Sequence, residues 1–188
     1  MLAGVEPPEG SPAGDKGARM RQISVIGAAS CSAAEYEEAR QVGLLLAARE
    51  VVLVCGGLGG VMEAAARGAK EGGGTTIGIL PGHDPTLANR YIDFPVTTGL
   101  GEARNLVVVS SGQAVIALGG SYGTLSEIGL AAKIGRPVVI LNSWRLEQPH
   151  AVSAEDTLIH RASSADEAVS LAFALCAGSS QPAPGGSS

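Results

Sequence analysis

Short apolar runs alternate with longer stretches of helical pattern along most of this chain, and this alternation limits the possible folds strongly. The runs are rich in Val, Ile, Leu and Ala, as in strands that are buried on both faces. Strands are predicted at Ile23–Gly27, Val51–Cys55, Thr75–Leu80, Gln113–Leu118 and Pro137–Leu141. Because helices separate them, the strands are expected to run parallel. The sequence therefore predicts one α/β domain of the Rossmann-like kind, with a mostly parallel sheet sandwiched by helices.

The segments between the strands carry the signals of helices. Helices are predicted at Ala33–Arg49, Val61–Glu71, Glu102–Ser111, Leu125–Ile134 and from Ser164 to about Cys176. Two of them begin with a capping box, in which a Ser and a Glu three residues later bond each other's backbone N–H groups; the pairs are Ser32 with Glu35 and Ser164 with Glu167. The segment Pro81–Gly99 is predicted to be irregular, apart from a short extended piece around Phe94–Thr98.

Length and composition indicate how many domains the chain has and which residues fold. The 188 residues suffice for one domain with a sizeable core, and only 3% of them are aromatic, so the core is expected to be aliphatic. Residues 1–19 and 178–188 are rich in Gly, Pro and small polar residues, which predicts a disordered N-terminal extension and a disordered tail. The Rossmann-like, nucleotide-binding domain is therefore expected at residues 20–177.

Charge and cysteine content argue against several classes of protein. The net charge of −5 disfavours a surface for nucleic acid. No apolar run reaches the length of a membrane span, and the N-terminus lacks the pattern of a signal peptide. Cys31, Cys55 and Cys176 have neither a metal-ligand spacing nor a disulfide framework, which fits a reducing compartment. We expect a cytoplasmic protein without a metal, nucleic-acid or membrane partner.

A glycine-rich turn, Gly119-Gly120-Ser121-Tyr122-Gly123-Thr124, joins a predicted strand to the helix that follows. A strand, a glycine turn and a helix start in that order form an anion site. The glycines admit a phosphate close to the backbone, and free N–H groups of the helix point at it. These six residues are predicted to bind a phosphorylated small molecule. Ser30, at the first strand-to-helix turn, is a further candidate donor to the phosphate.

A second glycine loop, Gly56-Gly57-Leu58-Gly59-Gly60, follows the second predicted strand. It is not the dinucleotide motif G-x-G-x-x-G, because Met62 stands where the third glycine would fall, and no Walker motif occurs. The glycines serve either close packing of strand on helix or ligand contact. Two glycine pairs exceed what packing needs, which favours ligand contact by Gly56, Gly57, Gly59, Gly60 and Met62.

Two charged residues are candidate catalytic groups. Glu127 lies one turn beyond the phosphate turn, where a carboxylate repels phosphate unless it has another role. However, Thr124-x-x-Glu127 is also the spacing of a capping box, so spacing alone leaves both interpretations open. Arg104 is either a bidentate phosphate clamp or a solvated helix charge. Cys31 has no His partner and is not expected to be a nucleophile.

Two stretches together resemble a known family. Gly56–Ala69 resembles the G-G-x-x-G-x-M…A-x-G-A stretch of the LONELY GUY family and its relatives, often labelled lysine decarboxylase-like. Tyr122-Gly123-Thr124-Leu125-Ser126-Glu127 resembles the end of its P-G-G-x-G-T-x-x-E motif, and Arg104 falls where the family has its catalytic Arg. The resemblance covers nearly all of residues 20–177 and implies a Rossmann-like fold in a protein that is usually at least dimeric.

The resemblance also implies an activity. The best-known members hydrolyse cytokinin riboside 5′-monophosphates to free base and ribose 5-phosphate. Glu127 would then assist the attack of water or stabilise the oxocarbenium-like ribosyl centre, and Arg104 would position phosphate or base. Gly120, Gly123 and Thr124 would hold the 5′-phosphate. Decarboxylation is not supported, because no lysine is placed to bind pyridoxal phosphate, and no cofactor is expected.

The chain departs from the family motif at four positions: Gly119 replaces Pro, Ser121 replaces Gly, Asn105 replaces Lys, and Ser126 replaces an acidic residue. These features resemble an uncharacterised bacterial branch of the superfamily. A similar branch includes the molybdenum cofactor carrier proteins, which bind a pterin phosphate without turning it over. Three functions therefore stay open: a nucleoside 5′-monophosphate phosphoribohydrolase, a non-catalytic carrier of a phosphorylated cofactor, and a nucleotide sensor. A homodimer or larger homo-oligomer is expected, with the small faces of Val61–Gly72 and Leu125–Gly135 as candidate contacts.

Overall fold

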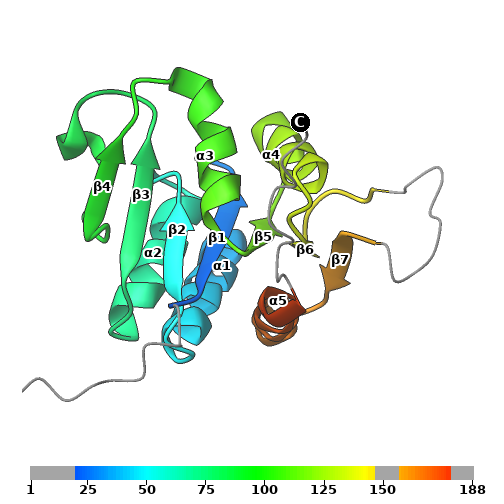
Figure 1. Ribbon diagram of the computed structural model, residues 1–188. Coiled ribbons are helices and arrows are strands. Elements are labelled where there is room, and N and C mark those ends of the chain that lie inside the picture. Colours follow the sequence, from blue (N-terminus) through cyan, green and yellow to red (C-terminus); the bar gives the residue numbers. More distant parts are fainter. Residues whose placement is uncertain (1–19, 147–156, 179–188) are drawn as a thin grey trace, which may run out of the picture.

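The computed structural model describes residues 20–146 and 157–178. Its centre is a seven-stranded, fully parallel sheet in the order β4-β3-β2-β1-β5-β6-β7 (Figure 1). The strands are β1 (Gln22–Gly27), β2 (Val52–Cys55), β3 (Thr76–Leu80), β4 (Phe94–Thr97), β5 (Ala114–Leu118), β6 (Val138–Leu141) and β7 (Ile159–Ala162). The α/β, Rossmann-like fold is confirmed, and the five predicted strands differ from the observed ones by a single residue at the first position.

Helices cover both faces of the sheet (Figure 1). One face carries α1 (Ala33–Ala47), α2 (Val61–Glu71) and α5 (Ala165–Gly178), and the other carries α3 (Arg104–Ser111) and α4 (Tyr122–Lys133). Two short 3-10 turns, η1 (Pro85–Leu87) and η2 (Gly101–Ala103), lie in the connections around β4. Each face has an aliphatic core, so the Val-, Ile-, Leu- and Ala-rich strands are buried from both sides.

The start of one helix and the presence of one edge strand differ from the predictions for local reasons. Helix α4 begins at Tyr122, because Ser121 rather than Thr124 is its N-cap residue. Strand β7 was not predicted, because Ile159-His160-Arg161-Ala162 is a partly exposed edge strand without an apolar run. The extended piece predicted near Phe94 is confirmed as β4. The capping box of Ser32 and Glu35 is also confirmed, with both reciprocal hydrogen bonds present.

Helices α1 and α2 pack closely through glycines. A Cβ on Gly43 would lie 2.8 Å from the backbone nitrogen of Ala69, and one on Gly68 would lie 2.7 Å from the carbonyl carbon of Arg40. The small face of α2 that contains Gly68 therefore packs within the chain, against α1.

The topology places one crevice at the carboxyl edge of the sheet. Strand β1 lies between β2 and β5, and the chain proceeds outward from it in both directions. Ligands in such sheets bind where the strand order reverses, beyond the carboxyl ends of the strands. Helices α2 and α4 both begin there, after β2 and β5.

Two further predictions concern the terminal segments and the absence of a membrane span. The segments 1–19 and 178–188, predicted to be disordered, lie outside the described residues except for Gly178, the last residue of α5. Among the helices that the structure describes, none combines the length and the apolar character needed to cross a membrane.

Candidate functional site

A cavity of about 190 Å³ lies at the crevice beside β1, between the starts of α2 and α4 and the N-terminal part of α3. Its charged and amide groups are Arg104, Glu127, Glu102 and Asn105. The other lining residues are Val25, Ile26, Gly27, Ala29, Gly56, Leu58, Met62, Ser121, Gly123 and Thr124. Residues from four separate segments of the chain thus lie together at the carboxyl edge of the sheet, where ligands bind in folds of this kind.

Arg104 is the most unusual residue of the cavity. It is only 8% exposed, and its Nε is buried without a hydrogen-bond partner. The described residues also contain no ion-pair partner for its guanidinium. The alternative of a solvated helix charge is therefore wrong. A buried Nε–H group without a hydrogen-bond partner costs free energy, and an acceptor in the cavity would supply what it lacks.

Glu127 lies on α4, with its carboxyl group buried in the same cavity. It is 7% exposed, and burial raises its pKa to about 7, although the charge of Arg104 opposes the rise and Glu102 adds to it. The capping-box alternative is wrong, because the cap of α4 is Ser121, whose hydroxyl accepts from the Thr124 backbone N–H at 3.5 Å. Glu127 is therefore free for contact with a ligand.

The turn before α4 is held by the tryptophan that follows β6. The indole Nε1 of Trp144 donates to the carbonyl of Ser121 at 3.2 Å, and its ring lies directly beside Gly120. The first backbone N–H groups of α4, those of Tyr122 and Gly123, donate to no acceptor in the described chain and are open to an anion. The Tyr122 side chain instead points outward, 82% exposed, with its ring 5.7 Å from that of Trp144.

Some residues of the Gly56–Gly60 loop are needed for the backbone geometry and packing, and others line the cavity. Gly57 and Gly60 have positive φ angles of 72° and 63°, and a Cβ on Gly60 would lie 2.6 Å from the carbonyl oxygen of Ala29. These two glycines serve the chain's own geometry. Gly56 and Met62 line the cavity, whereas Gly59 does not line it, and their contact with a ligand stays a prediction.

Several predicted site residues lie beside the cavity rather than in its wall. These are Ser30, Gly57, Gly59, Gly60, Gly119, Gly120 and Tyr122. Asn105 and Glu102 were missed as site residues. Asn105 follows Arg104 in the sequence and is equally buried, and the departure from the family motif at this position was the available signal.

The cysteines do not add a nucleophile. Partial burial and the nearby carboxylates of Glu35 and Glu63 raise the pKa of Cys31, and burial raises the pKa of Cys55 to about 11. Both thiols therefore stay protonated near neutral pH. Among the described residues, no group of three or more His, Cys, Asp or Glu side chains is arranged to hold a metal ion.

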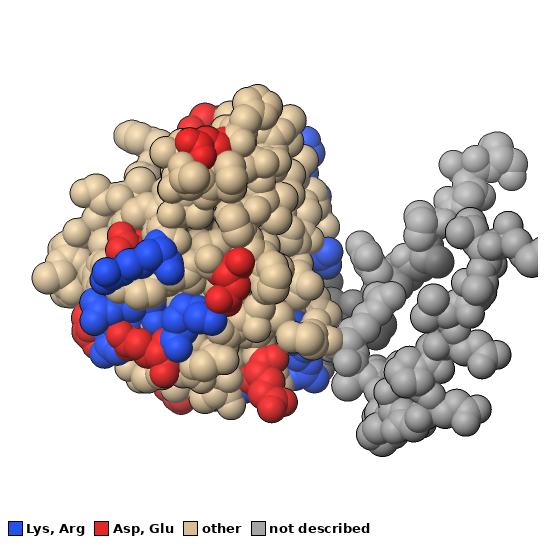
Figure 2. All heavy atoms as spheres, turned by 90° about the vertical axis from the view of Figure 1, so that its left-hand side faces the viewer, with Lys and Arg blue, Asp and Glu red and all other residues tan. Residues whose placement is uncertain are grey.

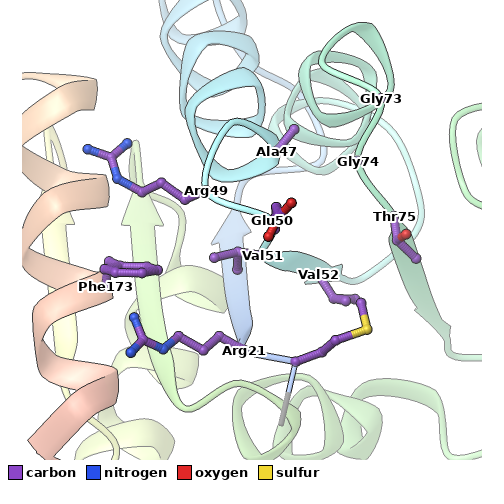
Figure 3. Close-up of a pocket in the computed structure, with 11 residues that line it drawn as sticks. Arg21, Ala47, Arg49, Glu50, Val51, Val52, Gly73, Gly74, Thr75 and Phe173 are labelled. Carbon is purple, nitrogen blue, oxygen red and sulfur yellow. The ribbon is translucent and has the colours of Figure 1, made fainter. Parts of the chain in front are cut away.

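A larger cavity, of about 680 Å³, lies at the opposite edge of the sheet, near Arg21, Arg49 and Phe173 (Figure 3). Its two arginines already have partners. The Arg21 guanidinium lies 4.0 Å from the centre of the Phe173 ring, and Arg49 donates to Ser170 at 3.0 Å. The smaller cavity is the better candidate site, because it alone of the two holds a buried cation without a partner.

Comparison with known proteins supports the resemblance. A molybdenum cofactor binding protein from Rippkaea orientalis has a similar structure, with a TM-score of 0.75 and 36% identity, covering 84% of this chain and 98% of that one. An uncharacterized protein of Archaeoglobus fulgidus is 47% identical over 123 residues, which are 65% of this chain and 81% of that protein.

A probable cytokinin riboside 5′-monophosphate phosphoribohydrolase of Oryza sativa subsp. japonica is 32% identical over 141 residues, 66% of this chain and 60% of the rice protein. The relationship to the LONELY GUY superfamily, and to its branch with the molybdenum cofactor carriers, is confirmed. The SLOG cluster4 family matches residues 20–169. Because this match spans most of the sequence, the chain belongs to the SLOG cluster4 family.

Proposed function

We propose that this chain binds the phosphorylated end of a small molecule in the cavity between α2, α3 and α4, and that it carries a pterin phosphate such as the molybdenum cofactor. The observation that carries the proposal is the Arg104 guanidinium, which is nine-tenths buried beside the cavity and whose Nε has no hydrogen-bond partner in the described part of the chain. A phosphate group supplies the charge and the acceptors that this side chain lacks.

The start of α4 offers the second half of a phosphate site. The free N–H groups of Tyr122 and Gly123 lie at the positive end of the helix dipole, and the Ser121 and Thr124 hydroxyls lie beside them. Arg104 and Ser121 both line the cavity. A phosphate between them would be held from both sides.

The size of the cavity limits how much of the ligand enters it. Pockets that enclose a whole drug-sized ligand have volumes of about 300 to 1,000 Å³. The volume here is about 190 Å³, enough for the phosphate and the adjoining part of the ligand. The rest of the ligand would lie outside the cavity, over its rim. This agrees with a carrier, because a carrier must release its ligand to another protein.

Similarity favours the carrier over the hydrolase. The Rippkaea molybdenum cofactor binding protein is matched over 98% of its length, whereas the rice phosphoribohydrolase is matched over 60%. The chain also has Asn105 where the hydrolase motif has Lys, so the cavity has one positive charge fewer. These two facts support binding without turnover.

Phosphoribohydrolase activity remains the second candidate, and Glu127 favours it. A buried carboxyl group with a pKa of about 7 is divided between its two protonation states at neutral pH. Its ionised form would stabilise positive charge at a ribosyl centre, and its neutral form would donate a proton to a leaving base. Cleavage of a nucleoside 5′-monophosphate would release free base and ribose 5-phosphate.

Retention of the cofactor tests the carrier. The purified protein is mixed with molybdenum cofactor, passed through a desalting column, and analysed for bound molybdenum by mass spectrometry. We expect near-stoichiometric retention by the wild type and little by Arg104→Met. Equal, low retention by both proteins would overturn the carrier.

Product analysis separates the two candidates. The wild type and Glu127→Gln are incubated with a panel of nucleoside 5′-monophosphates, and free base and ribose 5-phosphate are measured by mass spectrometry. A carrier yields no product from any nucleotide. Release of both products by the wild type, lost in the variant, would assign the hydrolase and a catalytic role for Glu127.

A further inference from the structure

The larger cavity, of about 680 Å³, lies at the amino edge of the sheet, away from the site of the proposed function. It is lined by Met20, Val52 and Thr75, which stand at or just before the starts of β1, β2 and β3. Its volume falls within the range of about 300 to 1,000 Å³ that encloses a whole small ligand. Val51, Val52 and Phe173 give it an apolar wall, and a few polar side chains lie among them (Figure 3).

The Arg21 guanidinium contacts the protein through its flat face and not through its edge. Its Cζ lies 4.0 Å from the centre of the Phe173 ring, which is a cation–π contact. This contact leaves the N–H groups at the edge of the guanidinium free, and no carboxylate in the part of the chain that the structure describes pairs with them. Arg49, by contrast, is held by Ser170, to which its Nη2 donates at 3.0 Å. Arg21 is therefore the cation of this cavity that can receive an anionic group.

Glu50, which also lines the cavity, occupies a backbone position that normally belongs to glycine. The Val51 N–H donates to the Leu46 carbonyl at 3.1 Å and the Glu50 N–H to the Ala47 carbonyl at 2.9 Å, which is the Schellman motif that ends a helix. The residue before the last donor is left-handed in this motif and is most often Gly. Here it is Glu50, with a φ of 55°. A side chain in this conformation costs free energy.

The charge of Glu50 adds a second cost. The carbonyl end of α1 bears a partial negative charge, which repels a carboxylate. Elsewhere charges of opposite sign lie next to one another, as on the β4 side of the molecule (Figure 2), and Arg67 with Glu71 and Lys70 with Asp93 form such pairs. Among the described residues, Glu50 has no ion-pair partner. A costly residue that lines a cavity indicates a role in binding.

We propose that this cavity binds a small amphoteric molecule, which places an anionic group against the edge of the Arg21 guanidinium and a protonated amine against the Glu50 carboxylate. A purely anionic ligand would be repelled by Glu50, and a purely cationic one by Arg21. The apolar part of the ligand lies against Phe173 and Val51, and the Thr75 hydroxyl is a further hydrogen-bonding group. Free amino acids and their ω-amino relatives are the chemical class with these features. The site is separate from that of the proposed function, because no described residue lines both cavities.

Thermal unfolding of the full chain with a panel of probes tests the class of ligand. The panel contains the common amino acids and ω-amino acids of increasing chain length, each beside the matched carboxylic acid without the amine and the matched amine without the carboxylate. We expect at least one amino acid to raise the midpoint of unfolding and neither of its matched halves to do so, and calorimetric titration then gives its affinity. No shift with any probe, or an equal shift with a matched acid or amine, would overturn the proposal.

Glu50→Gly tests the carboxylate. It should raise the unfolding midpoint of the ligand-free protein, because it removes both costs, and it should weaken binding of the amino acid by roughly tenfold or more. Asn142→Gly is the matched control, since Asn142 is the other non-glycine residue with a positive φ in the described chain, at 47°, and does not line the cavity. This control should leave the affinity unchanged. A Glu50→Gly protein that binds as tightly as the wild type, or that is no more stable, contradicts the role of Glu50.

Arg21→Lys tests the guanidinium. The change keeps a positive charge near Phe173 but loses the planar edge, so the affinity for the amino acid should fall by roughly tenfold. Wild-type affinity in this variant would rule out the role of Arg21. Arg104→Met should leave binding of the amino acid unchanged, and Glu50→Gly should leave retention of molybdenum cofactor unchanged. The two sites can therefore fail independently of each other.

Discussion

Arg104 occupies the space that a side chain on Gly56 would need. A Cβ on Gly56 would lie 2.9 Å from Cζ of Arg104 and 2.5 Å from Sδ of Met62. The glycine at the end of β2 therefore allows a guanidinium from α3 to lie against the backbone, although the two residues are far apart in the sequence.

Gly56→Ala should displace Arg104 and weaken ligand binding. The added methyl group meets the guanidinium, so we expect a loss of affinity of roughly tenfold or more, of the size of a lost charge-assisted hydrogen bond. Calorimetric titration with the tightest-binding nucleotide of the panel measures it. Gly59→Ala is the matched control, because a Cβ there has only one neighbour, at 3.4 Å. Equal affinities of the two variants would contradict the role of Gly56.

Arg104→Met should make the protein without ligand more stable and its binding weaker. The change removes a buried guanidinium whose Nε has no hydrogen-bond partner among the described residues, and it keeps most of the apolar contact. Thermal unfolding should show a higher midpoint, and calorimetric titration should show a roughly tenfold to hundredfold loss of affinity. Arg49→Met, in the other cavity, should leave the affinity unchanged. A less stable Arg104→Met protein with normal affinity would refute the assignment.

The ionisation of Glu127 should make stability depend on pH. Its pKa is about 7 in the folded chain, against a reference value of 4.5, so the folded state holds the proton more tightly. Folding stability therefore falls as the pH rises from 4.5 to about 7. Glu127→Gln should relieve this cost above pH 7, by at most about 3 kcal/mol, and the gain should vanish below pH 4.5. Urea denaturation at pH 4 and pH 8 measures both. A gain that is the same at the two pH values would contradict the raised pKa.

Trp144→Phe should loosen the turn that begins α4. It keeps an aromatic ring beside Gly120 but removes the N–H group that donates to the Ser121 carbonyl. We expect a loss of about 1 kcal/mol in unfolding free energy, together with weaker phosphate binding. Chemical denaturation and calorimetric titration report the two effects. Tyr122→Phe, which keeps the ring next to Trp144, serves as the control and should change neither.

The order of strands and helices could be predicted from the sequence because it depends on local patterns. Apolar runs such as Ala114–Leu118 are buried from both sides wherever they lie in a parallel sheet, and Ser32 caps α1 through a residue three positions away. Strand β7 was not predicted, because an edge strand that contains His160 and Arg161 lacks a continuous apolar run.

The sequence by itself determined the fold class, the position of the glycine turn before α4 and the choice of Arg104 and Glu127 as candidates, since glycine spacing and charge at helix starts are local properties. Only the tertiary structure excluded the alternatives of a capping box for Glu127 and a solvated charge for Arg104. It showed that Ser121 caps α4, which frees Glu127, and that Arg104 is buried against Gly56 without a partner. Burial and the absence of a partner depend on contacts between distant segments, and no local pattern in the sequence encodes them.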